Sequence, residues 1–133
     1  MMIDQAFQTA IKLLYATNPL LYGSAEGQSG TYHVMIKVAD AERPDTLCQE
    51  QGDSGRALFQ FSTYGENAPT IIINLAETLK DIVADVKGVI GTAPNKFSIY
   101  NNMTSSVTLI NEGSSSLNVW GVIFESEIWW TKI

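Results

Sequence analysis

Hydrophobic and polar residues alternate between positions 57 and 64, a pattern typical of a β-strand whose two faces meet different surroundings. One face of the predicted strand would carry Ala57, Phe59, Phe61 and Thr63, and the other Leu58, Gln60, Ser62 and Tyr64. Gly65 then interrupts the pattern. The alternation predicts a strand that ends near this glycine.

A helical repeat follows directly. The apolar positions recur every three or four residues and form one stripe: Ile72, Leu75, Ala76, Leu79, Ile82, Val83 and Val86. Asn67 can cap this helix, and Pro69 fits its first turn, where a missing N–H costs no hydrogen bond. Lys87 suits the negative end of the helix, and Gly88 suits a left-handed cap. These signals agree on a strand–turn–helix unit over residues 56–88.

The same two periodicities predict the remaining elements. A first helix is expected over about residues 3–17, on the helical spacing of Ile3, Ala6, Phe7, Ala10, Ile11 and Leu14. Residues 31–38 alternate as a strand, with an apolar face of Tyr32, Val34, Ile36 and Val38 opposite His33, Met35 and Lys37. Further strands are expected at 96–103 and through Val107, Leu109 and Ile110. The last strand would place on one face Trp120, Val122, Phe124, Ile128 and Trp130.

This succession predicts an α+β domain of order α-β-β-α-β-β. A mostly antiparallel β-sheet would carry both helices packed on one face. The 133 residues fit a single domain, 1–133, which is long enough to bury a core. Flexible loops are expected at about 22–30 and 39–54, because both stretches are polar and rich in turn-forming residues.

Composition narrows the functional classes. The net charge is −6 and there is no run of Lys and Arg, which argues against a nucleic-acid grip through phosphates. The single Cys48 excludes an internal disulfide framework and fits a reducing compartment. The N-terminus lacks the pattern of a signal peptide, and no apolar run approaches the ~20 residues that span a membrane.

Catalytic chemistry is not expected. Gly52-Asp53-Ser54-Gly55 resembles the nucleophile segment of trypsin-like serine proteases, but Arg56 stands where a second glycine is needed. A serine nucleophile also needs a histidine base held by an aspartate, and His33 is the only histidine. The tetrapeptide is better interpreted as a turn before a strand. We therefore expect no enzyme.

No metal or cofactor is expected either. His33 has no partner at a ligand spacing, so a solvent-facing or interface histidine is the simpler interpretation. Acidic residues gather in the second predicted loop without the spacing of a calcium site, which indicates a solvated acidic loop: Asp40, Glu42, Asp45, Glu50 and Asp53. The glycines at 23, 27 and 30 lack the Gly-Lys-Ser/Thr ending of a phosphate loop.

Four apolar residues are candidates for a subunit or partner interface. Ile73 lies roughly 120° from the centre of the helical stripe, and Ile71 flanks that stripe. Trp129 and Trp130 are consecutive in a strand, so their side chains must leave opposite faces of the sheet. Tryptophan is favoured as an interface anchor.

The element order, with Phe59-Gln60-Phe61-Ser62-Thr63-Tyr64-Gly65 leading into the long helix and Trp120 to Trp129 closing the chain, resembles small phage tail terminator (tail completion) proteins of the lambda-like siphophage type. The resemblance covers nearly the whole chain. One departure is Gly30-Thr31 before Tyr32, where these proteins often carry a proline.

The resemblance implies a structural virion protein that assembles in the host cytoplasm and becomes part of the tail. Its copies would form a hexameric ring on the major tail tube protein and join the head–tail connector protein, with DNA passing through the lumen without specific binding. The acidic stretch 39–54 would be a lumen-facing or docking element. The alternatives are a head–tail connector, neck or minor tail protein, and a small cytoplasmic protein that binds a ligand between sheet and helices.

Overall fold

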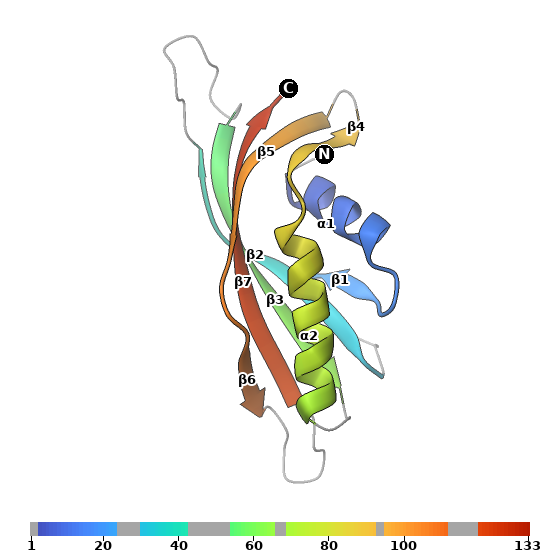
Figure 1. The fold of residues 1–133 in the computed structure, drawn as a ribbon. Helices are drawn as coiled ribbons and strands as arrows, with labels where there is room; N and C mark the ends of the chain where they lie inside the picture. The colour runs from blue at the N-terminus through green and yellow to red at the C-terminus, as the bar shows by residue number, and fades with distance from the viewer. Residues whose placement is uncertain (1–2, 24–29, 43–53, 66–68, 93–94, 112–119) are drawn as a thin grey trace.

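The computed structural model describes residues 3–23, 30–42, 54–65, 69–92, 95–111 and 120–133 (Figure 1). Two helices and seven strands follow one another along these residues. Their order is α1 (Ile3–Leu14), β1 (Leu20–Tyr22), β2 (Tyr32–Glu42), β3 (Ser54–Gly65), α2 (Pro69–Ala84), β4 (Gly88–Thr92), β5 (Asn95–Thr104), β6 (Thr108–Asn111) and β7 (Trp120–Lys132).

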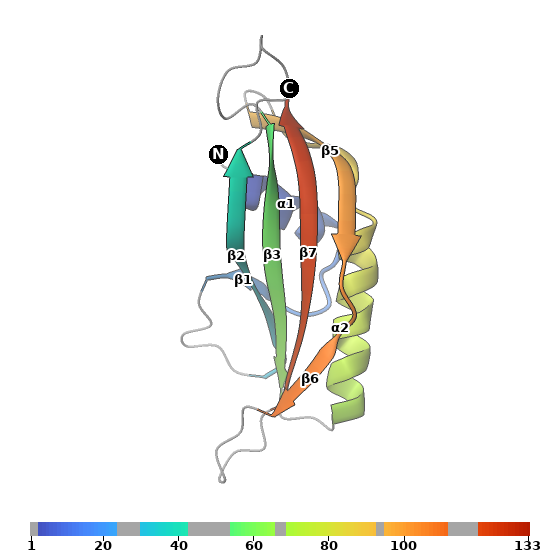
Figure 2. The same ribbon diagram turned by 90° about the vertical axis from the view of Figure 1, so that its left-hand side faces the viewer.

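The strands form one sheet in the order β1-β2-β3-β7-β5-β4, and β6 also pairs with β7. Only β1 and β2 run parallel; the other pairs are antiparallel. Figures 1 and 2 show both helices on the same side of the sheet, and no helix of the described residues lies over the opposite side. The predicted α+β class, with a mostly antiparallel sheet and two helices on one face, is confirmed. We call the side away from the helices the outer sheet face.

The predicted order α-β-β-α-β-β is wrong in detail: β1 and β4 were missed, and the order counts two strands after the second helix where the described residues form four. The strand β1 has three residues, too few for an alternating pattern, and it exists because Leu20 to Tyr22 pair with β2. The strand β4 contains Gly88 and Gly91, and the antiparallel ladder with β5 holds it extended. Gly88 has the positive φ of 80° expected for it, although α2 already ends at Ala84.

The core lies between the helices and the inner sheet face. Ala57, Phe59, Phe61 and Thr63, which the alternation placed on one face of β3, are all buried. So are Val122, Phe124, Ile128 and Trp130 of β7. The rings of Phe61 and Phe124 stack with centroids 5.0 Å apart, and Phe7 of α1 packs on Phe59 at 5.1 Å. Each fully buried Phe or Leu side chain contributes roughly 2 kcal/mol through the hydrophobic effect. The predicted stripe is confirmed in its buried members: Ile72, Ala76, Leu79 and Val83 of α2, and Val86 just beyond its end.

The predicted apolar face of the strand at 31–38 is not the one that meets the main core, although its Val34 is buried. His33 and Met35 are fully buried, whereas Ile36 and Val38 are exposed. Alternation alone cannot say which face of a strand meets the core, and here the register decides it. His33 pairs with Thr63 and Met35 with Phe61, and directly opposite residues of an antiparallel pair share a face.

Candidate interaction surfaces

Both ends of the predicted loop 39–54 lie in strands, since β2 extends to Glu42 and β3 begins at Ser54. Asp40 and Glu42 belong to β2, whose ladder with β3 continues as far as the pair Glu42 and Gly55. This pairing overrides the polar composition, so the expectation that 39–54 is one loop is corrected. Asp45, Glu50 and Asp53 lie outside the described residues, as does the stretch 24–29 of the other predicted loop.

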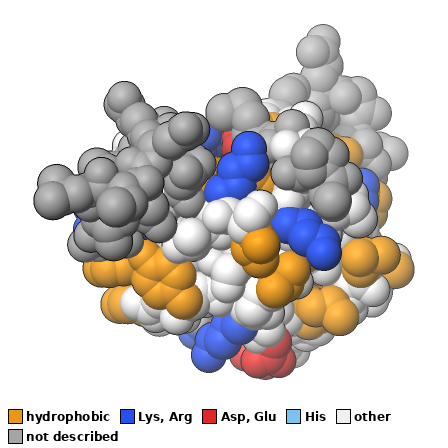
Figure 3. All heavy atoms as spheres, turned by 90° about the horizontal axis from the view of Figure 1, so that it is seen from above, with side chains coloured by type: hydrophobic (Ala, Val, Ile, Leu, Met, Phe, Trp, Pro, Cys, Tyr) orange, Lys and Arg blue, Asp and Glu red, His pale blue; other side chains and the backbone are white. Residues whose placement is uncertain are grey.

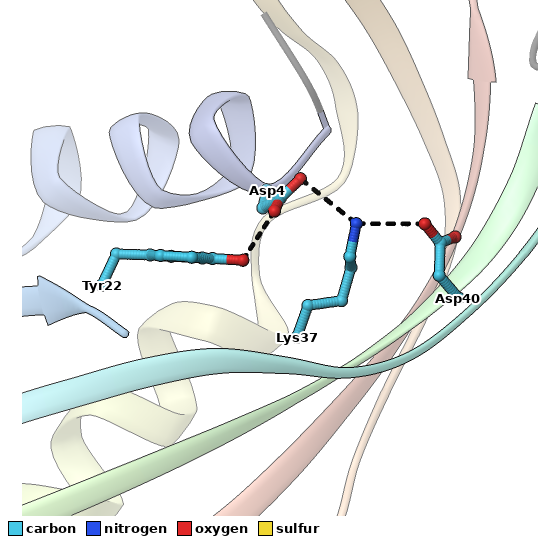
Figure 4. Close-up of polar contacts among 4 residues, drawn as sticks. All are labelled: Asp4, Tyr22, Lys37 and Asp40. Carbon is cyan, nitrogen blue, oxygen red and sulfur yellow. Dashed lines mark hydrogen bonds and ion pairs between the residues drawn. The ribbon is translucent and has the colours of Figure 1, made fainter. Parts of the chain in front are cut away.

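Asp40 contributes instead to a polar cluster at the start of α1 (Figure 4). The Tyr22 hydroxyl donates to Asp4 Oδ2 at 2.6 Å. Lys37 Nζ donates to Asp40 Oδ2 at 3.0 Å and forms an ion pair with Asp4 Oδ1 at 3.6 Å. That second distance exceeds hydrogen-bond length, so the buried Asp4 Oδ1 interacts with the lysine by charge alone. The cluster joins α1, β1 and β2.

The protonation states make this cluster an ionic clamp. Burial and the hydrogen bond to Asp4 raise the pKa of Tyr22 to about 12. Burial by itself lowers the pKa of Lys37, but the hydrogen bond to Asp40 and the charges of both aspartates outweigh it, so this pKa is raised. At neutral pH the lysine is therefore charged and the tyrosine is neutral. Neither can act as a general base.

His33 is not the solvent-facing residue that the sequence suggested. Its imidazole is fully buried, with Nε2 2.7 Å from the Tyr15 hydroxyl and Nδ1 2.7 Å from Thr63 Oγ1. Burial lowers the pKa of His33 to about 4, so the ring is neutral at neutral pH. The register with β3 explains this placement, as it does for Met35.

Ser54, the serine of the protease-like tetrapeptide, lies far from the only histidine. It is buried at the start of β3, nine residues before Thr63, the partner of His33 in the ladder. At the rise of a β-strand, nine residues correspond to about 30 Å. The fold therefore does not bring a histidine base to this hydroxyl, as nucleophilic catalysis requires.

The two tryptophans leave opposite faces of β7, as alternation predicted. Trp130 is buried on the inner face, with its ring 5.4 Å edge-on from Phe97, so this core residue is not offered to a partner in this conformation. Trp129 lies on the outer sheet face, half-buried. Its Nε1 donates to Glu127 Oε1 at 2.8 Å, and Arg56 lies 6.0 Å from its ring centroid. Of the pair, only Trp129 remains available at the surface.

Of the two isoleucines predicted for an interface, Ile71 is exposed and Ile73 is partly covered. Ile73 is half-buried and packs against the small cluster of Ile72, Ala76 and Val122, so it is not the residue that core packing leaves over. Ile71 is 49 % exposed and is the member of the pair that solvent reaches. The first turn of the helix packs closely on β7, and that contact decides which isoleucine is covered.

The outer sheet face carries exposed apolar side chains that the sequence did not identify. Ile36, Val38, Tyr100 and Met103 are exposed there on β2 and β5. Carboxylates lie among them, since Met103 pairs with Glu127 in the β5–β7 ladder. A shallow hollow of about 240 Å³ is lined by Leu58, Met103, Thr104, Ser105, Glu125 and Glu127. This face, turned toward the viewer in Figure 2, also carries Arg56, whose Nε lies 3.8 Å from Glu127 Oε1, so its apolar side chains are mixed with charges of both signs.

A second apolar surface lies on the helix side. A groove of about 430 Å³ runs between α1 and β4, and we call it the α1–β4 groove. Its walls are Ala6, Thr9, Ala10, Leu13, Leu14, Asp85, Val86, Lys87, Val89, Ile90, Gly91 and Thr92. Leu13 is 82 % exposed and Val89 60 %. Seen from above, this end of the molecule shows hydrophobic side chains interspersed with lysine or arginine (Figure 3).

The groove exists because β4 ends the sheet. An edge strand has no neighbour on one side, and α1 covers β4 only in part. The spacing of Ala6, Ala10 and Leu14 was visible as part of a helical repeat, but the neighbouring strand β4 was missed. Sequence reasoning therefore had no means of finding this site.

Comparisons with known proteins support the fold alone. No family model matches this sequence, and no curated protein matches it. One solved structure, known only by a sequence identifier, is similar with a TM-score of 0.51 and 11 % identity. The match covers 95 % of this chain and 92 % of the other. Identity this low shows a shared fold and no function.

Two further observations concern the described residues. None of their helices is long and apolar enough to cross a bilayer. They also contain no group of three or more His, Cys, Asp or Glu side chains placed to hold a metal ion.

Proposed function

We propose that this chain is a structural protein of a phage virion, a tail terminator whose copies form a ring on the end of the tail tube. The observation that carries the proposal is a sheet with helices on one face only and exposed apolar residues on the other. Monomeric proteins rarely leave such surfaces uncovered, and partner proteins commonly cover them. The particular assembly comes from the resemblance in element order and closing strand.

A ring subunit needs two different surfaces, because a closed ring is built from head-to-tail contacts. This chain offers two: the outer sheet face and the α1–β4 groove. They lie on different sides of the sheet, which suits contacts to two neighbours. Ile71 and Trp129 are additional exposed or half-exposed candidates for contacts to the tail tube protein or the head–tail connector.

The charge is compatible with a passage for DNA. A net charge of −6 opposes a tight grip on phosphates, so DNA could move through the lumen without specific binding. In this proposal Asp45, Glu50 and Asp53 face the lumen or dock on a partner. In this proposal the protein is purely structural and carries no catalytic residue and no cofactor.

Assembly can be tested directly on the purified chain. Native mass spectrometry across a concentration series, followed by negative-stain electron microscopy, should reveal a ring, expected to be hexameric. A chain that stays monomeric at every concentration, also with tail tubes present, would contradict the proposal.

The role within the tail needs a phage in which this gene is deleted. Abnormally long headless tails are the expected result, because tube polymerisation would lack its stop. Tails of normal length without heads would instead favour the alternative of a connector or neck protein. Electron microscopy of lysates distinguishes the two outcomes.

A second candidate function rests on the size of the α1–β4 groove. Its volume of about 430 Å³ lies within the range of small-molecule sites. A small protein that binds an apolar ligand between helix and sheet would use such a groove. A ligand that binds only the native state raises the melting temperature, so a thermal-shift screen tests this alternative.

A further inference from the structure

The strand β4 has one edge with which no other described strand pairs. On the neighbouring strand β5, the carbonyl oxygen of Lys96 accepts from the N–H of Ile133, so the backbone groups of Lys96 point away from β4. Gly91 stands opposite Lys96 in the antiparallel ladder, and its N–H and C=O therefore point to the free edge. Those of Val89, two residues earlier, point the same way. Val89 is 60 % exposed, which leaves this edge accessible.

The helix α1 runs beside this edge and forms the other wall of the α1–β4 groove. One face of the helix lines the groove with Ala6, Ala10, Leu13 and Leu14. From Ala6 to Leu14 this wall is about 12 Å long at the rise of an α-helix. A strand of four residues has nearly the same length, about 13 Å. The groove therefore fits an extended segment that lies between α1 and the edge of β4.

The two long borders of the sheet differ in how they are protected. Beyond Met35, β2 has no described neighbour on the side of β1. That stretch carries a bulge between Lys37 and Ala39, and the Lys37 side chain turns inward to Asp4. Bulges and inward-pointing charges keep other chains away from an edge. The strand β4 contains no charged residue and no proline, and its ladder with β5 has no register shift, so its edge can accept another strand.

We propose that the α1–β4 groove binds an extended segment of a partner protein, which adds to β4 as a further strand. Its backbone pairs with the outward N–H and C=O groups of Val89 and Gly91, and every second side chain lies against α1. These side chains are apolar, because alanine, leucine, valine and isoleucine make up most of the groove walls. The inference goes beyond the proposed tail terminator and holds whether or not the chain forms a ring.

The variant Val89→Pro tests the backbone pairing. Proline removes the outward N–H, and a strand tolerates it at an edge position whose N–H faces solvent. The ladder with β5 does not use this N–H, so the fold should persist, and the melting temperature checks this. Val89→Thr is the matched control, because it changes the side chain at the same position but keeps the N–H.

The probe is a library of short random peptides, displayed on their own mRNA and selected on the full-length wild-type chain. Enriched peptides should carry apolar residues at alternate positions. Fluorescence polarisation should show that Val89→Pro weakens their binding by roughly tenfold or more, whereas Val89→Thr binds them nearly as the wild type does. Enriched peptides that bind Val89→Pro and wild type equally would overturn strand addition, as would a library without any enriched peptide.

Amide hydrogen exchange, followed by NMR on the wild type, tests the same contact without a substitution. An enriched peptide should slow exchange of the Val89 amide, which gains an acceptor, and should change that of Ile90 little, because the Ile90 N–H already faces β5. Slowing that occurs elsewhere and spares Val89 would overturn the proposed site. Protection of Val89 that rises with protein concentration in the absence of peptide would assign the edge to a second copy instead. None of these results depends on the ring, which the assembly experiments test separately.

Discussion

The imidazole Nε2 of His33 lies 2.7 Å from the hydroxyl oxygen of Tyr15, in a buried contact that joins β2 to the residue after α1. The Tyr15 hydroxyl donates its single proton to Asn18 Oδ1 at 3.0 Å. Its oxygen must therefore accept from His33, which assigns the imidazole proton to Nε2. Nδ1 then accepts from Thr63 Oγ1 at 2.7 Å. The neutral ring satisfies both of its nitrogens, and a second proton, on Nδ1, would force the Thr63 hydroxyl to change from donor to acceptor.

This contact predicts that the chain loses stability as the pH falls from 6.5 to 4. The folded-state pKa of His33, about 4, lies below its ordinary value of 6.5. Above pH 6.5 the imidazole is neutral in both states and its contribution is complete. Below that, the unfolded chain binds the proton first, so the free energy of unfolding falls, by up to about 3 kcal/mol near pH 4.

Urea unfolding at a series of pH values measures this effect. His33→Gln removes the titrating group, so the variant should lose less stability than the wild type over that interval. The difference between the two curves isolates His33 from the carboxylates that also titrate below pH 5. Parallel curves would show that the ring is protonated equally easily in both states.

The Asn102 side chain should stabilise the C-terminal end of α2 and the residues that follow it. Its Nδ2 donates to the carbonyl oxygens of Val83 at 2.8 Å and Val86 at 3.0 Å, and its Oδ1 accepts from Ser126 Oγ at 2.9 Å. Asn102→Ala should lower the free energy of unfolding by about 2 kcal/mol, because two carbonyls lose their donor. Thermal or urea denaturation measures this loss.

A nearly isosteric control separates the hydrogen bonds from shape. Asn102→Asp places a carboxylate against the two carbonyls at the negative end of the helix, so it should destabilise at least as much as Asn102→Ala at neutral pH. Asn101→Ala, on the neighbouring residue, should cost less. Equal stability of Asn102→Asp and the wild type would exclude a stabilising role for the two hydrogen bonds from Asn102 to the carbonyls of Val83 and Val86.

Gly55 should tolerate no side chain, because Trp130 and β2 occupy the space beside it. A Cβ at this position would lie 2.8 Å from the carbonyl oxygen of Ala41 and 2.9 Å from Trp130 Cζ2. Gly55→Ala should destabilise by roughly 1–3 kcal/mol, the usual cost of overpacking. The loss of a native tryptophan fluorescence signal in denaturant gives the measurement.

Gly65→Ala provides the comparison on the same strand. Its Cβ would meet Ile72 Cδ1 at 2.6 Å and Thr31 Oγ1 at 2.9 Å, both side-chain atoms that can turn away. The carbonyl oxygen of Ala41 beside Gly55 belongs to the backbone and cannot turn away. The cost should therefore be larger at Gly55, and the reverse order would contradict this account.

The ionic clamp at the start of α1 should behave as a coupled pair. Lys37→Met removes the cation between Asp4 and Asp40 and leaves the buried Asp4 with only the Tyr22 hydroxyl. We expect a loss of roughly 1–3 kcal/mol. Adding Asp4→Asn to Lys37→Met should recover part of it, because the uncompensated charge disappears. A double-mutant cycle by urea denaturation checks the coupling, and strictly additive losses would argue against it.

Local patterns were sufficient for much of the fold. The strand through Phe59 and Phe61 and the apolar stripe of α2 appear where alternation and helical spacing placed them. The opposite facing of Trp129 and Trp130 follows from the pleat alone. These features depend on residues close together in the chain, so the sequence reveals them.

Other features depended on pairing between distant residues. The strand β4 forms because β5 holds it, and β1 because β2 does. Asp40 looked like a loop residue, yet the ladder between β2 and β3 includes it. Propensity and composition carry no information about such partners, and pairing overrides them.

By itself the sequence determined the α+β class, the division of β3 and β7 into two faces, and the net negative charge. Only the tertiary structure decided that His33 is buried, that Ile73 packs while Ile71 is exposed, and that the α1–β4 groove lies open at the sheet edge. The physical reason is that periodicity divides an element into two faces, whereas long-range register and packing choose which face enters the core.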